Sequence, residues 1–160
     1  MHRFRLVAIP SQAFDSLRGQ PDGALRARGI RRRRADENPG FPCRVSLADA
    51  EVGEEVLLLP FTHHDVDSPY RASGPIFVRM GSATARPEVG EIPEMLRTRL
   101  LSVRGYDAEG MMIAAAVTEG RDLEAHIDRA FSDPRVEYLH LHNARPGCYN
   151  CRVERVLGAR

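Results

Sequence analysis

The sequence predicts a single α+β domain over residues 1–160, with a mostly antiparallel sheet and about two main helices. Short apolar runs of strand length outnumber helical patterns, and the helices do not alternate regularly with the strands. No repeat or linker divides the chain. Its 160 residues suit one domain, and a hydrophobic fraction of 42% with 28% charged residues is typical of a globular protein.

The N-terminal half predicts one helix among several strands. Phe4–Ile9 is a β-prone run that ends at Pro10, and Ser11 can cap a helix with Phe14 and Leu17 on one face. An arginine-rich stretch, 26–35, is interpreted as an exposed strand that pairs with acidic neighbours. Two apolar runs of buried-strand type follow, at Val56–Phe61 and Ile76–Val78.

The C-terminal half predicts two hairpins around the second main helix. A short helix can begin at Pro93. The first hairpin pairs Leu100–Tyr106 with Met111–Val117 around Asp107–Gly110. The helix Asp122–Phe131 carries Leu123, Ile127 and Phe131 on one face. The second hairpin joins Val136–His142 to Cys148–Val156.

All 23 basic residues are arginine, and the absence of lysine excludes several chemistries. Without lysine there is no Schiff base with pyridoxal phosphate and no P-loop nucleotide site. The net charge of +1 disfavours nucleic acid as a partner, and Asp36 and Glu37 neutralise part of the arginine run. The apolar runs are too short for a membrane span or a signal peptide, so we expect a cytoplasmic protein.

The C-terminal hairpin carries a possible zinc site. His140 and His142 share one strand face, and Cys148 and Cys151 have the Cys-x-x-Cys spacing. If His142 pairs with Cys148, Cys148 and Asn150 join the histidine face. If Asn143 pairs with Cys148, Tyr149 and Cys151 join it instead. Either regular register brings only one cysteine to the histidines, so four zinc ligands would require an irregular turn. The spacing also fits a thiol redox pair or structural residues.

A polar stretch between two apolar strands, Thr62–Gly74, is the second candidate site. Long loops between buried strands are often functional. This one offers His63 or His64 as a general base, Tyr70 and Ser73 as hydroxyl groups, and Arg71 as an anion partner. The alternative is a surface loop whose polar residues simply form turns.

Several segments resemble a known bacterial family. Pro42-Cys43-Arg44, Gly53-Glu54, Pro69-Tyr70, Gly74-Pro75-Ile76-Phe77 and Gly147-Cys148-Tyr149, in this order, look like domain of unknown function 1203 (DUF1203). The resemblance implies no established activity. It also implies a second cysteine one residue after Pro-Cys-Arg, where this chain has Ser46. Cys43 itself is either a nucleophile activated by Arg44 and a histidine or a small buried residue.

Three functional hypotheses follow, and the cofactor stays unknown in each. The first is a domain that binds or converts a small molecule, with an anion as one option. Its candidate catalytic residues are His63, His64, Tyr70, Ser73 and Arg44. Its candidate ligand-binding residues are Arg71, Arg145, His140 and His142. The second is a non-enzymatic homodimeric interaction module. The third is a domain stabilised by zinc at His140, His142, Cys148 and Cys151.

Overall fold

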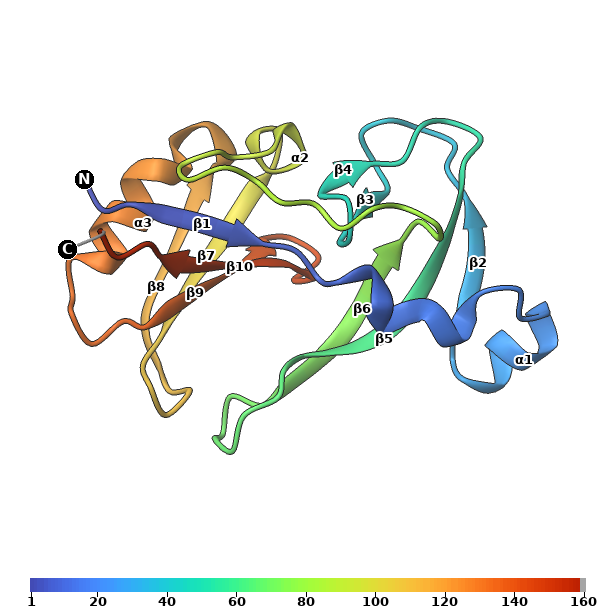
Figure 1. Ribbon diagram of the computed structural model, residues 1–160, viewed down its shortest axis with the longest axis horizontal. Helices are drawn as coiled ribbons and strands as arrows, with labels where there is room; N and C mark the ends of the chain where they lie inside the picture. Colours follow the sequence, from blue (N-terminus) through green and yellow to red (C-terminus); the bar gives the residue numbers. More distant parts are fainter. Residues whose placement is uncertain (159–160) are drawn as a thin grey trace.

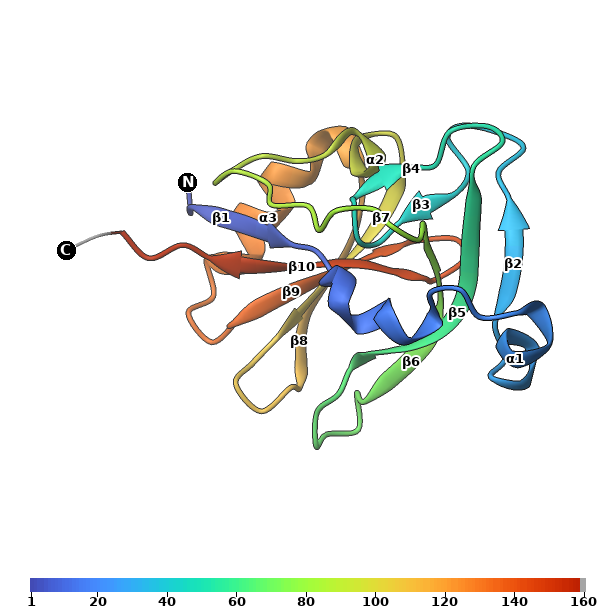
Figure 2. The same ribbon diagram turned by 45° about the vertical axis from the view of Figure 1, so that its right-hand side comes forward.

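Two five-stranded sheets lie side by side in the computed structural model, which describes residues 1–158 (Figures 1 and 2). The first sheet has the order β1-β10-β9-β7-β8, with β1 Phe4–Val7, β7 Leu100–Tyr106, β8 Met112–Glu119, β9 Tyr138–Asn143 and β10 Tyr149–Arg155. The second has the order β2-β5-β6-β3-β4, with β2 Arg31–Arg34, β3 Pro42–Cys43, β4 Ala48–Asp49, β5 Glu55–His64 and β6 Ala72–Val78. All strand pairs are antiparallel except β3 with β6, which are parallel.

The helices are few and short. The two longest are the 3-10 helix η1, Ser11–Leu17, and α3, Leu123–Phe131, so both main helices predicted from the sequence are confirmed. The others are α1 Asp22–Ala27, α2 Glu94–Arg97 and η2 Gly120–Asp122. Helix α1 was not predicted, because its only buried side chain is Leu25 and such a short segment shows no apolar face.

Each sheet has its own hydrophobic core. Helix α3 buries Leu123, Ile127 and Phe131 against Leu139 and Leu141 on one face of the first sheet. The second sheet packs on η1 and α1, and Tyr149 of β10 reaches into this second core. The opposite face of the first sheet therefore turns towards the second sheet (Figure 1). The α+β class with mostly antiparallel strands is confirmed, but the strands divide into two sheets where one was expected.

The polar stretch between β5 and β6 is shorter than predicted. The strands continue to His64 and restart at Ala72, so the connecting loop is confined to residues 65–71. The ladder reaches this far because Thr62 pairs with Ser73 and His64 pairs with Ala72. No helix among residues 1–158 is long and apolar enough to cross a membrane.

Candidate functional site

A bulge in β5 brings two consecutive histidines to the first sheet. In a regular strand, neighbouring side chains point to opposite faces. The register of β5 shifts between Thr62 and His64, and the extra residue is His63. As a result, the rings of both His63 and His64 meet the ring of His140 on β9, at centroid distances of 6.2 and 4.9 Å.

These histidines belong to a cluster of aromatic rings that fills the space between the sheets. His63 stacks on Tyr149 at 5.2 Å and meets His142 edge-on at 5.0 Å. The cluster, which we call the histidine cluster, consists of His63, His64, Tyr106, Tyr138, His140, His142 and Tyr149. The sequence-predicted candidates His63, His64, His140 and His142 therefore do come together.

Hydrogen bonds satisfy only part of the cluster. His64 uses both ring nitrogens, with the Tyr70 carbonyl at 2.8 Å and the Tyr138 hydroxyl at 2.7 Å. His142 Nδ1 contacts the Gly147 carbonyl at 2.9 Å. In contrast, His63 Nδ1, His140 Nδ1 and His142 Nε2 are buried and have no partner among the described residues.

The surroundings keep three of the imidazoles neutral. Burial, aided by the neighbouring His64, lowers the pKa of His140 to about 2. Burial also lowers the pKa of His142 to about 4. The pKa of His63 falls to about 4, through burial and then the charges of His64 and Arg104. The cluster is thus a poor source of protons and a poor site for positive charge at neutral pH.

The zinc site, one of the alternatives for the C-terminal hairpin, is not assembled among the described residues. Tyr149 pairs with His142, but the next pair joins Cys151 to Leu141, so a bulge at Asn150 turns Cys151 to the opposite face of the sheet. Cys151 lies fully buried in the core beneath α3, where burial raises the pKa of its thiol to about 12. Within residues 1–158, no three His, Cys, Asp or Glu side chains lie close enough together to hold a metal ion.

The remaining residues of the predicted loop site do not converge on the cluster. Arg71 forms an exposed ion pair with Asp65 at 2.7 Å. The Ser73 hydroxyl lies 2.9 Å from that of Thr62 on the exposed surface of β6. Tyr70 is 37% exposed and reaches only the edge of the cluster, with its ring centre 6.3 Å from that of Tyr106.

Cys43 is fully buried, which agrees with its interpretation as a small core residue. Its sulfur accepts backbone hydrogen bonds from Arg79 at 3.3 Å and Ser46 at 3.5 Å, and it lies 3.6 Å from the Ser82 hydroxyl. Burial raises its pKa, but these hydrogen bonds together outweigh burial and lower it. No described histidine contacts this thiol, so the alternative interpretation, a nucleophile activated by Arg44 and a histidine, has no histidine partner among residues 1–158.

Arg44 is the buried residue that links the two sheets. Its backbone N–H donates to the Phe77 carbonyl of β6, and its side chain is 1% exposed. The guanidinium donates from Nε to the Tyr149 carbonyl of β10 at 2.7 Å and from Nη1 to the Pro42 carbonyl at 2.5 Å. Nη2 makes no hydrogen bond to the described residues. No described carboxylate forms an ion pair with Arg44.

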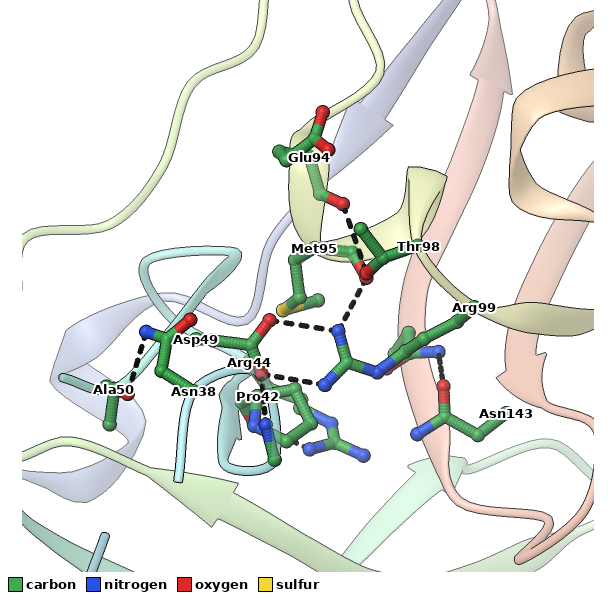
Figure 3. Close-up of polar contacts among 12 residues, drawn as sticks. Asn38, Pro42, Arg44, Asp49, Ala50, Glu94, Met95, Thr98, Arg99 and Asn143 are labelled. Atoms are coloured by element: carbon green, nitrogen blue, oxygen red, sulfur yellow. Dashed lines mark hydrogen bonds and ion pairs between the residues drawn. The ribbon is translucent and has the colours of Figure 1, made fainter. Parts of the chain in front are cut away.

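Arg44 lines a cavity of about 390 Å³ at the junction of the two sheets, which we call the arginine pocket. One wall is apolar and comes from β5 and β6, with Leu58, Pro75 and Phe77. The polar wall is made by Arg44, Thr98, Arg99, Asn143, Arg145 and Cys148. Figure 3 shows how the side chains of Arg44, Arg99 and Asn143 from three separate segments lie around this region.

The charges of the pocket are not balanced. Arg99 is neutralised by a bidentate pair with Asp49, at 2.8 and 2.6 Å, and also donates to the Met95 carbonyl (Figure 3). Arg145 is exposed and has no ion pair or hydrogen bond from its side chain among the described residues. Burial lowers the pKa of Arg44 to about 10, so this residue stays charged at neutral pH. Two positive charges therefore remain without a counter-charge.

In a larger hollow elsewhere, the arginines are paired with acidic side chains. It measures about 600 Å³ and is lined by Arg32, Arg34 and Arg79 on the second sheet. Glu54 pairs with Arg79 at 2.7 Å, and Glu55 lies within ion-pair distance of both Arg32 and Arg34. Because its arginines already have acidic partners, this hollow has little charge left for a ligand. These pairs agree with the acidic neighbours expected for the arginine-rich strand.

Sequence reasoning missed several residues of both sites. Arg104 is a residue of β7 and pairs with His140 on β9. Its side chain donates to the Ser102 hydroxyl at 3.2 Å, and its positive charge helps to lower the pKa of His63 and of His142. Its alternation with Tyr106 on a predicted strand is a signal that could have placed it on the histidine face. Thr98 and Arg99 precede a strand and carry no such signal.

The fold and site define an α+β protein with an arginine-lined pocket between two antiparallel sheets. The model of a family described as a protein of unknown function (DUF1203) matches residues 40–155, and the chain belongs to this family. The matched region contains the arginine pocket and the whole histidine cluster. No curated protein and no solved structure matches the chain.

Proposed function

We propose that this protein binds a small organic anion in the arginine pocket. The observation that carries the proposal is Arg44, a buried and charged side chain with no carboxylate partner among residues 1–158. Burial of an unpaired charge is costly, and proteins usually avoid it. A bound anion would supply the missing counter-charge and accept the hydrogen bonds that the free Nη2 group can donate.

The two walls of the pocket suggest the shape of the ligand. Its anionic group would lie between Arg44 and Arg145, and the free amide nitrogen of Asn143 is a further donor, since its Oδ1 already accepts from Asn150 at 2.8 Å. An apolar body would pack on Leu58 and Phe77. The cavity of about 390 Å³ is within the size range of small-molecule sites, about 300–1,000 Å³.

In this proposal, the histidine cluster supports the pocket and is not its reactive part. The β9–β10 turn carries Arg145 and Cys148, and the His142 ring bonds to the Gly147 carbonyl of the same turn at 2.9 Å. Tyr149 connects the two sites, since its ring packs in the cluster and its carbonyl accepts from Arg44. A rigid cluster would thereby hold both arginines at a fixed separation.

The test compares benzoate with benzamide, two ligands of nearly equal shape that differ in charge. Calorimetric titration of the whole protein should detect saturable binding of benzoate and much weaker binding of benzamide. Replacing Arg145 by glutamine should weaken benzoate binding about tenfold or more, since a charge-assisted hydrogen bond contributes about 1.5–3 kcal/mol. Arg121→Gln is the matched control, because Arg121 is 79% exposed on η2 and outside the pocket.

Three results would contradict the proposal. One is equal binding of benzoate and benzamide, which would remove the role of charge. The second is benzoate binding that is the same in Arg145→Gln, Arg121→Gln and the unmodified protein. Absence of binding by benzoate, phenylphosphate and phenylacetate alike at millimolar concentration would also reject it.

A further inference from the structure

The four edges of the two sheets differ in how they are protected. Free strand edges invite pairing with another chain, and proteins usually block them with charge, short length or covering segments. Edge strand β2 consists of four arginines, and β4 is two residues long. Edge strand β1 is four residues long, and Gly90 donates a hydrogen bond to its Phe4 carbonyl. Each of these three edges is therefore protected.

Strand β8 has none of these protections. It runs for eight residues, Met112–Glu119, with the sequence MIAAAVTE, and its only charged side chain is at the end. Strand β7 is its only strand partner in the part of the chain that the structure describes. Within the described residues, no segment outside the sheet forms a backbone hydrogen bond with residues 112–119. Its outward-facing backbone groups are thus unpaired.

The side chains of β8 are more typical of a protein interface than of a strand that faces solvent. Val117 is 61% exposed, and Ala115 beside it is exposed as well. The strand contains no proline, and its single register irregularity lies at the Met112 end, opposite Tyr106. The part of the strand beyond this irregularity, residues 114–118, is regular and uncharged, and an edge of this kind pairs with another strand.

We infer that β8 is the interface of a homodimer, in which two copies pair their β8 strands antiparallel and join the two first sheets into one. Opposed residues in an antiparallel pair share a face, so a two-fold axis must pass through a residue position. An axis at Ala116 keeps the pairing within the regular part of the strand, and it places Ala115 opposite the partner's Val117 and Ala114 opposite the partner's Thr118. No like charges face each other, so the strand is compatible with its own copy.

A second copy is favoured over an unrelated peptide by this self-compatibility. The chain itself supplies a strand of equal length, small side chains and no charge along residues 112–118. The pairing leaves the arginine pocket free, because no residue of β8 lines it. The inference is therefore independent of the proposed ligand.

The experiment measures the mass of the protein in solution by analytical ultracentrifugation over a range from about 1 to 200 µM. The expected result is a species of twice the 17.9 kDa chain mass at the higher concentrations. Val117→Lys places two positive charges at the interface of each dimer and should raise the dissociation constant about tenfold or more. Val52→Lys is the matched control, because Val52 is 64% exposed on the second sheet side, before β5.

A second measurement does not depend on a substitution. Amide hydrogen exchange in residues 112–119 should slow as the protein concentration rises, while exchange in β2 stays the same. A purely monomeric protein at 200 µM would overturn the inference. So would a dimer that Val117→Lys and Val52→Lys affect equally, or one whose β8 amides exchange at the same rate as in dilute protein.

Discussion

Acidification from pH 7 to pH 5 should destabilise this protein strongly, because His140 and His142 are buried as neutral rings. In the unfolded chain each has a pKa near 6.5, whereas the pKa in the folded protein is about 2 for His140 and about 4 for His142. Below pH 6.5 the unfolded chain gains protons that the folded chain does not bind, so stability falls as the pH drops. At pH 5, about 1.5 units below the unfolded pKa, each ring contributes a loss of about 2 kcal/mol, or about 4 kcal/mol together. His63, which is only half-buried and has a pKa of about 4, adds a smaller loss in the same direction.

Urea unfolding followed by circular dichroism at pH 7, 6 and 5 measures this loss. Carboxylates titrate mainly below this range, so the histidines dominate the change. His140 makes no side-chain hydrogen bond to the described residues, and His140→Leu should therefore reduce the loss by about 2 kcal/mol. His126→Gln, on helix α3 outside the cluster, should leave it intact. A stability that changes by less than about 1 kcal/mol between pH 7 and 5, or an undiminished loss in His140→Leu, would refute the reasoning.

Two further predictions concern stability. Asp49→Asn removes the counter-charge of Arg99, in a pair whose side chains are 8% exposed for Asp49 and 15% exposed for Arg99. This change should lower the free energy of unfolding by about 3 kcal/mol. A loss below about 1 kcal/mol in urea unfolding at pH 7 would contradict this. Gly120→Ala places a Cβ atom 1.8 Å from the Leu96 carbonyl oxygen and should lower the melting temperature by about 10 °C or more. Gly23→Ala is the control and should change the melting temperature little, because its Cβ atom meets nothing within 4 Å. Equal melting temperatures of the two variants would show that the close approach of η2 to α2 is not required.

Much of the fold could be predicted from the sequence because local patterns determine it. The hairpin around Asp107–Gly110 and the helix ending at Phe131 follow from turn chemistry and apolar spacing, and both are present. The division into two sheets could not be predicted in this way. It depends on long-range pairings, such as β1 with β10 and β3 with β6, that no local pattern encodes.

The candidate site was predictable in part for the same reason. Alternation along β9 places His140 and His142 on one face, and the structure agrees. The bulges at His63 and Asn150 were not foreseen, since one extra residue in a strand leaves no mark in a polar sequence. The first bulge brings His63 and His64 to the cluster, and the second turns Cys151 away from it. The sequence predicts one site that combines Arg44 and Arg145 with the polar stretch after β5; the fold places both arginines at one pocket, and no residue of that stretch lines it.

The central claim is that Arg44 and Arg145 face one small anion. The most direct measurement is a titration of ¹⁵N-labelled protein with benzoate, observed by nuclear magnetic resonance on backbone amides and arginine Nε–H groups. We predict saturable shifts with one common dissociation constant at Arg44 Nε, Thr98 and the turn 143–148, and none at the arginines of β2. Shifts that do not saturate, or that spread over the exposed arginines without the pocket responding, would contradict the account.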